Sequence, residues 1–280
     1  MKSKEELAAD QAAFWNGPGG KMWLGAYERI QQGIAGFGEV VLKAANAQSG
    51  ERVLDIGCGT GGTTAALAKA VGPGGHVLGV DISEPLVGVA RAQKLGNATF
   101  EVGDATTFPF QAGSVDLVFS RFGVMFFGDP VAAFTNIRRA LKPSGRLVFL
   151  CWRPAKENPW AGVPMRAADP HLPPMERPGA EDPGQYSFGD RARVERILTG
   201  AGFAAPSFEP VDLMLDQGKD IPDVLQRISD FGPLARRFKD STPEQIAKAK
   251  EAIAAALKPY AQPDGVKLAG ACWLVRAQPA

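Results

Sequence analysis

One glycine-rich segment restricts the possible folds of this chain more than any other feature; it spans residues 53–62 and reads VLDIGCGTGG. An apolar run, Arg52–Ile56, leads into it, and Thr63–Val71, which has helical character, follows. The spacing Gly57-x-Gly59-x-x-Gly62 places residues without a Cβ in the turn, so a ligand can lie against the backbone at the helix N-terminus. Because Asp81 ends the next expected strand, this context predicts a site for an adenosine-containing cofactor.

Apolar runs and helical stretches alternate through the first half of the chain. Residues 1–48 are predicted to form an amphipathic helical cap, interrupted at residues 16–20 by a turn cluster. We expect three helices, one at Thr63–Val71, one that begins after Ser83 as its N-cap, and one at Pro130–Leu141. Strands are expected at residues 52–56, 76–80, 99–102, 115–120 and 146–152. Strands that alternate with helices indicate right-handed βαβ units and a doubly wound, mostly parallel α/β sheet of Rossmann-like type.

After Trp152 this alternation stops. Residues 153–188 hold eight of the 22 prolines, and this density predicts an extended loop. Helices are expected at 190–200, 222–238 and 243–257, and strands at 208–215 and 271–275. The organisation predicted is a cap at 1–48 and one α/β domain at 49–280, with the loop 153–188 and a helical insertion at 219–262 forming a lid on the acceptor side.

Two further acids indicate which adenosine cofactor the turn takes. Asp55 lies inside the turn, where it would repel a pyrophosphate but would suit the amino group of an amino-acid tail. Asp104 follows the third expected strand, so Asp55, Asp81 and Asp104 come at three adjacent strand ends. Three carboxylates can hold an amine, a ribose diol and an adenine amino group. A cationic, phosphate-free ligand of this kind is S-adenosylmethionine.

The composition disfavours several other classes of protein. The net charge is +1, which gives no excess of basic groups to attract nucleic acid. Three scattered cysteines and two histidines provide no metal site and fit a reducing compartment. The charged N-terminus is no secretory signal and no apolar run is long enough for a membrane span, so we expect a cytoplasmic protein, either a monomer or a homodimer.

The sequence resembles the class I S-adenosylmethionine-dependent methyltransferases, in a branch similar to the ubiquinone/menaquinone C-methyltransferases. This resemblance covers about Arg52 to Trp152 and rests on residues 53–62, 80–83, 103–105, 115–120 and 141–146. It implies a sheet of seven strands whose last strand is antiparallel. It also implies that S-adenosylmethionine is the cofactor and S-adenosylhomocysteine the product.

The resemblance assigns cofactor contacts to individual residues. The methionine moiety would be held by Asp55 and Gly57, with Gly59 and Gly61 beside it. The ribose would bind Asp81, and the adenine would lie against Ile82. The remaining assignments are Asp104 and the Ala105 amide at the adenine amino group and Ser120 on the methionine side.

The acceptor pocket is expected beyond the fourth and fifth strand ends. Methyl transfer from a sulfonium mainly requires alignment and exclusion of water, and some acceptors also need a base. Arg121 is a candidate for orienting an anionic acceptor and His171 for a general base. The expected walls are Phe122, Phe126, Trp15 and Trp152 for the acceptor and Trp23 for the cofactor. Each has a plain structural alternative, namely an ion pair for Arg121, and core packing or anchoring of the cap for the aromatic residues.

A small organic acceptor is the class of substrate that these observations favour. A nicotinamide-dependent oxidoreductase would use the same glycines and Asp81, but it would leave Asp55 and Asp104 unexplained. A non-catalytic S-adenosylmethionine-binding regulator also stays open, because methyl transfer needs few catalytic side chains.

Overall fold

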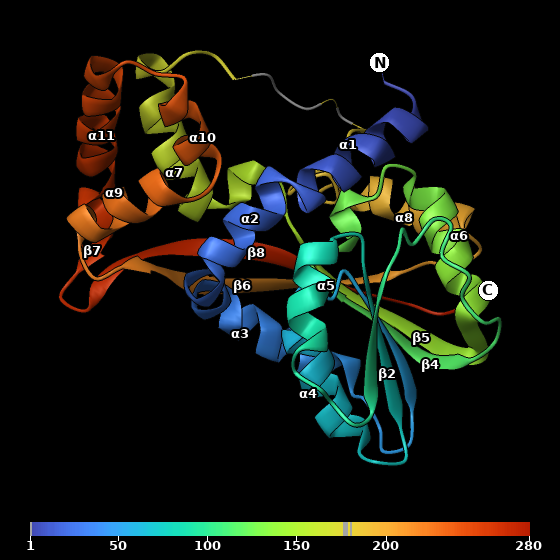
Figure 1. Ribbon diagram of the computed structural model, residues 1–280. Coiled ribbons are helices and arrows are strands. Elements are labelled where there is room, and N and C mark those ends of the chain that lie inside the picture. Colours follow the sequence, from blue (N-terminus) through green and yellow to red (C-terminus); the bar gives the residue numbers. More distant parts are fainter. Residues whose placement is uncertain (1, 176–178, 180) are drawn as a thin grey trace.

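A mostly parallel sheet forms the centre of the protein, as a computed structural model that describes residues 2–175, 179 and 181–280 shows (Figure 1). Its strand order is β3-β2-β1-β4-β5-β8-β6, and a short β7 pairs with β8. The doubly wound prediction is confirmed, and the two-residue β7 (Ala261–Gln262) adds an eighth strand to the seven expected.

Five parallel strands make up one half of this sheet. Their bounds are β1 (Arg52–Ile56), β2 (His76–Asp81), β3 (Ala98–Val102), β4 (Val115–Arg121) and β5 (Leu141–Trp152). The central strand β1 pairs with β2 on one side and with β4 on the other. After β1 the chain adds β2 and β3 on one side and then β4 and β5 on the other, so the strand order reverses at β1. Open α/β sheets bind their ligands at the carboxyl ends of the strands at such a point.

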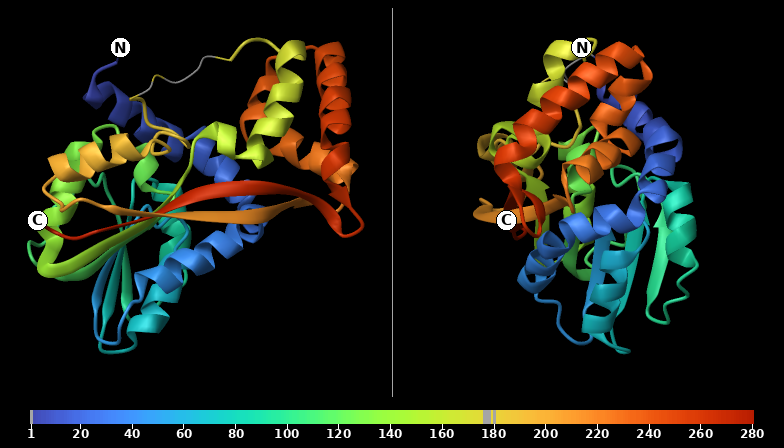
Figure 2. Two further views of the ribbon diagram at one scale, coloured as in Figure 1. Left: turned by 180° about the vertical axis from the view of Figure 1, so that it is seen from behind. Right: turned by 90° about the vertical axis from the view of Figure 1, so that its left-hand side faces the viewer.

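The other half of the sheet is a long antiparallel ribbon. β8 (Gly265–Ala277) runs antiparallel to both β5 and β6 (Ser207–Gly218), so the expected antiparallel last strand is confirmed. Both strands exceed the predicted 271–275 and 208–215. The ribbon projects beyond the parallel strands, as Figure 2 shows.

Helices cover the parallel strands. α4 (Gly62–Val71) and α5 (Glu84–Arg91) pack against β1 to β3, while α6 (Pro130–Ala140) packs against β5 and against α8 (Arg191–Gly200). The main core lies between these layers, and its largest fully buried side chains include Phe37, Phe119, Phe134, Phe149 and Leu117.

The N-terminal segment is helical, as predicted, and breaks at Gly17. It comprises α1 (Lys4–Asn16), α2 (Pro18–Gly25) and α3 (Tyr27–Ala45). Ser3 forms a capping box with Glu6 at the start of α1, which satisfies two otherwise unpaired backbone N–H groups.

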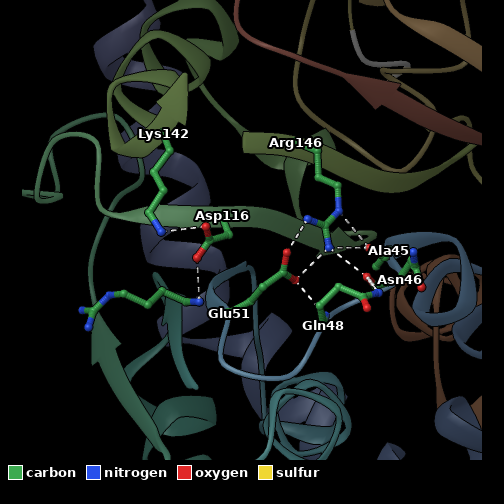
Figure 3. A network of polar contacts seen from close by, with 8 residues as sticks. Ala45, Asn46, Gln48, Glu51, Asp116, Lys142 and Arg146 are labelled. Carbon is green, nitrogen blue, oxygen red and sulfur yellow. Dashed lines mark hydrogen bonds and ion pairs between the residues drawn. The ribbon is translucent and has the colours of Figure 1, made fainter. Parts of the chain in front are cut away.

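A polar network at the amino ends of the strands fastens α3 to the sheet (Figure 3). The guanidinium of Arg146 donates to both carboxylate oxygens of Glu51, at 2.7 and 2.8 Å, and to the carbonyls of Ala45 and Asn46. Lys142 pairs nearby with Asp116 at 2.6 Å. These contacts hold the C-terminus of α3 in place and thereby set the position of the whole helix.

The prediction of an extended loop at 153–188 is wrong for most of its first half. The chain there forms short 3-10 turns at Ala155–Glu157 (η2) and Asp169–His171 (η3), and the helix α7 (Pro159–Ala168) between them. Pro159 occupies the first position of α7, where the missing N–H is not needed. Pro164 lies inside the helix but is buried, so packing compensates for the lost backbone bond. Residues 176–178 and 180 lie outside the described part.

α7 belongs to a group of four helices that stands over the ribbon of β6 and β8 (Figures 1 and 2). The others are α9 (Ile221–Asp230), α10 (Pro233–Lys239) and α11 (Pro243–Leu257). We predicted one helix over 222–238, but the chain breaks at Phe231 and Gly232, whose φ of +95° favours glycine. This group has its own apolar cluster, which includes Val163, Leu234, Ile253, Leu257 and Leu268.

Among the helices of the described residues, none is both long and apolar enough to cross a membrane.

Candidate cofactor and acceptor site

The glycine turn after β1 has a backbone that side chains would not tolerate. Gly57, Gly59 and Gly61 have φ values of +70°, +55° and +84°. A Cβ on Gly57 would lie 2.7 Å from the Cα of Gly123, so the turn after β1 packs directly on the turn after β4. A Cβ on Gly59 would meet no atom of the described part of the chain within 4 Å, which leaves open space where a ligand can approach the backbone.

Asp55 is fully buried at the base of this turn. Its Oδ2 accepts hydrogen bonds from the hydroxyls of Thr63 and Thr64, at 2.8 and 2.7 Å. Among the residues that the structure describes, its Oδ1 has no hydrogen-bond partner. Burial raises the pKa of Asp55 to about 6, although the two threonine hydroxyls and the charge of Arg121 oppose the rise. A buried carboxylate oxygen without a donor is a fitting acceptor for an ammonium group.

Asp81 ends β2 and is held by backbone groups. Its Oδ2 accepts from the N–H of Gly59 at 2.8 Å, and its Oδ1 accepts from the N–H of Ser83 at 2.9 Å. Burial raises its pKa, against these hydrogen bonds. The N–H of Ile82 also acts on this carboxylate, which can accept about four hydrogen bonds and so retains capacity for a hydroxyl of a diol.

Asp104 and Ala105 follow β3, next to the end of β2. The register pairs Asp81 with Val102, which places Asp104 two residues beyond this pair. Asp104 Oδ1 accepts from the N–H of Thr106 at 2.8 Å and so shapes the loop. Asn136 donates to the carbonyls of Ala105 and Phe108, at 2.9 and 2.8 Å. α6 therefore fixes the loop on which the predicted adenine contacts lie.

Ser120 is buried, and its hydroxyl accepts from the N–H of Gly123 at 3.2 Å. It thus supports the turn after β4 from within. Phe122 in this turn has a φ of +64°, a conformation that is rare for a large side chain, and its ring stacks on Trp152 at 4.7 Å with an interplanar angle of 8°. Backbone strain of this kind indicates that the ring position matters.

An aromatic wall continues from Phe122 and Trp152 to Trp160. The rings of Trp152 and Trp160 lie 5.0 Å apart. Asn158, which is fully buried, accepts from Trp160 Nε1 at 3.1 Å and from the N–H of Ala271 at 2.8 Å, so β8 fixes this wall. Trp152 is itself only 5% exposed.

A hollow joins the glycine turn to the end of β4. It brings together five residues of the sequence prediction, namely Trp23, Gly57, Gly59, Arg121 and Phe122, with Cys58, Thr60, Gly62 and Thr63. Gln31 and Ile34 of α3 also line it, and the sequence analysis missed them. The amphipathic pattern of α3 was the available signal, but it does not say which strand ends the helix will face.

The N-terminal cap is tied to the cofactor side of the sheet. Asn16 donates to the Ile82 carbonyl at 2.9 Å and accepts from the N–H of Glu84 at 2.9 Å. The hydroxyl of Ser83 donates to the Trp15 carbonyl at 2.8 Å. The ring of Trp15 packs edge-to-face on Phe126 at 5.2 Å and on Trp23 at 6.0 Å. Trp15 therefore anchors the cap and covers the strand ends at the same time.

His171 lies in η3, which packs against α7 and α11 in the helical group. The structure does not place it among the residues that line the hollow. Within the described residues there is also no group of three or more His, Cys, Asp or Glu side chains that could hold a metal ion.

Comparisons with known proteins agree with this geometry. Residues 53–145 match a protein-family model described as a methyltransferase domain. Over 112 residues the chain is 40% identical to a demethylmenaquinone methyltransferase of Staphylococcus aureus (strain JH9), a match that covers 39% of this chain and 46% of that protein. Over 191 residues it is 31% identical to an uncharacterized 37.1 kDa protein in transposon TN4556 of Streptomyces fradiae, which covers 68% of this chain and 54% of that protein.

The chain thus spans about half the length of the curated relatives it matches. Among solved structures, a putative methyltransferase from Bacillus halodurans C-125 has the same fold, with a TM-score of 0.56, 18% identity, and coverage of 87% of this chain and 99% of that chain. The glycine turn and the acids at the strand ends lie within the matched residues 53–145, which identifies this part of the chain as a methyltransferase domain.

Proposed function

We propose that this protein transfers a methyl group from S-adenosylmethionine to a small organic acceptor. The unpartnered Oδ1 of Asp55 carries this proposal. A buried carboxylate directly beneath the glycine turn fits the ammonium of an amino-acid tail, whereas it would repel the pyrophosphate of a nicotinamide cofactor. This argues against the oxidoreductase alternative.

The residues at the strand ends fit the remainder of this cofactor. Asp81 offers two oriented oxygens to the ribose diol, and the open space beside Gly59 lets the ligand lie on the backbone. Asp104 and Ala105 are assigned to the adenine, with Ile82 against its face. Gly57 and Gly61 give the turn its shape, and Ser120 supports the neighbouring turn through Gly123.

The chain has little chemistry to perform beyond alignment. When bound, S-adenosylmethionine supplies a methyl group that is already activated on a sulfonium. The aromatic wall of Phe122, Trp152 and Trp160 provides a flat apolar surface for an acceptor, and Trp15 with Phe126 closes the cap side against water. The roles predicted for Arg121 with an anionic acceptor and for His171 as a base stay predictions.

The relative named as a demethylmenaquinone methyltransferase supports a small acceptor over a macromolecular one. We further propose a cytoplasmic protein that acts without nucleic acid, as a monomer or a homodimer. Residues 1–48 would act as a cap on the domain 49–280, and the helical group over the ribbon as the acceptor-side lid. The contact between Arg236 of α10 and the ring of Phe14 in α1, at 5.7 Å, supports a lid that meets the cap.

Calorimetric titration with S-adenosylmethionine, S-adenosylhomocysteine and NADH tests the cofactor. We expect the first two to bind and NADH not to bind. The variant Asp81→Ala should weaken S-adenosylmethionine binding by about 1–3 kcal/mol, the contribution of hydrogen bonds to a charged group. Asp212→Ala is the matched control, because Asp212 is exposed and pairs with Arg153 on the ribbon. Binding of NADH alone, or an unchanged affinity of Asp81→Ala, would contradict the assignment.

Turnover decides between an enzyme and a non-catalytic regulator. Incubation with methyl-labelled S-adenosylmethionine and a panel of small phenols, quinols, thiols and amines should give a labelled product for at least one class. Cofactor binding without transfer to any acceptor in the panel would favour the regulator.

A further inference from the structure

Two opposite charges lie near each other at the ends of β1 and β4: Arg121 lines the hollow, and Asp55 is buried beneath the glycine turn that borders it. The register pairs Asp55 of β1 with Phe119 of β4, and side chains alternate along a strand, so Arg121 lies on the same face of the sheet as Asp55. Their fields reach each other: Arg121 counteracts the rise in the pKa of Asp55, and Asp55 counteracts the fall in the pKa of Arg121 that burial causes. The two side chains nevertheless form no ion pair.

Helix α3 holds Arg121 in place without neutralising it. The Nη2 of Arg121 donates to the Oε1 of Gln31, in α3, at 2.7 Å. A Cβ on Gly38 would come within 3.0 Å of Nη1, so the missing side chain makes room for the guanidinium. Gln31 and Gly38 are two helical turns apart on one face of α3. Within the described residues, the amide of Gln31 is the one hydrogen-bond partner of the Arg121 guanidinium, and it carries no charge.

Tyr27 extends this face of α3 to the start of α4. Its hydroxyl lies 3.3 Å from the position that a Cβ on Gly62 would take, and its charge interaction reaches Arg121. The first turn of α4 thus contacts Asp55 through Thr63 and Thr64 and lies close to the Tyr27 hydroxyl at Gly62.

We propose that Arg121 binds the carboxylate of the amino-acid tail of S-adenosylmethionine while Asp55 binds its ammonium, so that the pair recognises the tail as a zwitterion. This inference rests on the proposed function. An ammonium on Asp55 Oδ1 brings the attached carboxylate close to the carboxylate of Asp55, and this arrangement requires a nearby cation. Arg121 is the cation whose charge reaches Asp55. The ammonium and the carboxylate of the tail are attached to one carbon atom. A single ligand can therefore bridge Asp55 and Arg121, which are not in contact with each other.

The pair then makes the site selective for nucleosides that carry an intact amino-acid tail. S-adenosylhomocysteine should bind far better than 5′-methylthioadenosine, which has the same nucleoside and a thioether but no tail. Decarboxylated S-adenosylhomocysteine, which keeps the amine, should bind Asp55 but gain nothing from Arg121.

Calorimetry with these three ligands tests the inference on the full chain. Arg121→Gln should lower the affinity for S-adenosylhomocysteine by roughly 10- to 100-fold, the effect of losing a charged hydrogen bond. Its affinities for 5′-methylthioadenosine and for the decarboxylated ligand should stay within about twofold of the wild-type values. Arg121→Lys, which keeps the charge but loses the planar fork, should fall between the two. Arg29→Gln is the matched control, since Arg29 is also on α3 but pairs with Asp230 at the surface.

The outcomes separate this inference from the proposed function. Equal losses for all three ligands would overturn it, because they would show that Arg121 only supports the fold of the site. An unchanged affinity for S-adenosylhomocysteine with lost turnover would overturn it in favour of an anionic acceptor as the partner of Arg121. A wild-type protein that binds none of the ligands would overturn the proposed function itself. If Arg121→Gln does not fold, as a thermal melt would show, Arg121→Lys decides with the same three ligands.

Discussion

At the scale of single residues, Asp55 combines a cost in stability with a use in binding. Its carboxylate is fully buried, and of its two oxygens only Oδ2 has a partner among the described residues. An apolar or neutral residue would fold more easily there, since a buried charge without enough partners destabilises the folded state. Such a local conflict between folding and charge is typical of a functional position.

The raised pKa of Asp55 predicts a pH dependence of folding and binding with opposite signs. The pKa is about 6 in the folded protein against an ordinary 3.8, so the folded state binds the proton more tightly than the unfolded state. Stability of the cofactor-free protein should therefore be fully present below about pH 4 and fall by about 3 kcal/mol as pH rises through 6. Cofactor affinity should instead increase over this range, because the ammonium needs the ionised carboxylate.

Chemical denaturation and calorimetry between pH 4.5 and 8 measure both effects. In Asp55→Asn, which cannot ionise, both pH dependences should shrink, while cofactor affinity at pH 8 should fall. A pH profile of Asp55→Asn identical to that of the wild type would assign the titration to another group, such as Asp81, whose pKa burial also raises.

At the scale of elements, α1 is attached to the molecule at both ends and where the backbone of Ala8 packs closely on Gly128. No residue of α1 is fully buried. Its C-terminal end is fixed through Trp15 and Asn16 to the segment after β2, and its first turn pairs through Lys4 with Asp129 at 2.9 Å. An element that crosses the strand ends yet adds little to the core is suited to open and close at low cost.

Deletion of residues 1–16 should therefore impair cofactor retention more than folding. We expect one cooperative thermal transition, lowered by only a few degrees, together with faster dissociation of S-adenosylhomocysteine in stopped-flow measurements. The single variant Lys4→Ala, which removes only the exposed ion pair, is the control and should change little. Loss of the cooperative transition would mean that α1 is instead required for the core.

At the scale of the whole molecule, the two larger of three apolar clusters group elements that are not consecutive in the sequence. The main core joins α3, the parallel strands and α8, whereas the second cluster joins α7, α9, α10 and α11 with the far end of β8. The ribbon of β6 and β8 connects both, and Trp160 of α7 packs against both. We expect the helical group to loosen as a unit while the cofactor site stays folded.

Hydrogen exchange measured after one core substitution in each cluster tests this division. Ile253→Ala should cost about 2–4 kcal/mol and increase exchange in 159–171 and 221–257 while 52–152 stays protected. Phe134→Ala, in the main core, should increase exchange throughout. Equal loss of protection in both regions for Ile253→Ala would show that the protein unfolds as one cooperative body.

The sequence predicted best what depends on neighbours in the chain. The helix at 243–257 was predicted with the bounds that the structure has. The structure shows the local reason for its start, since Thr242 and Gln245 form a capping box and Pro243 occupies the first turn. The prediction of an extended loop at 153–188 failed because it used the number of prolines and not their positions. The length of the ribbon also escaped prediction, since only pairing between β6 and β8, which are far apart in the sequence, shows how far each strand extends.

For the site the same distinction applies. The sequence by itself determined the glycine turn and the acids that follow β1, β2 and β3, because strand, turn and helix N-terminus are consecutive and their geometry is local. Only the tertiary structure decided that Gln31 and Gly38 of α3 meet Arg121, and that Oδ1 of Asp55 is left without a partner. Gln31 and Arg121 are 90 positions apart in the sequence, and they meet because α3 packs against the sheet.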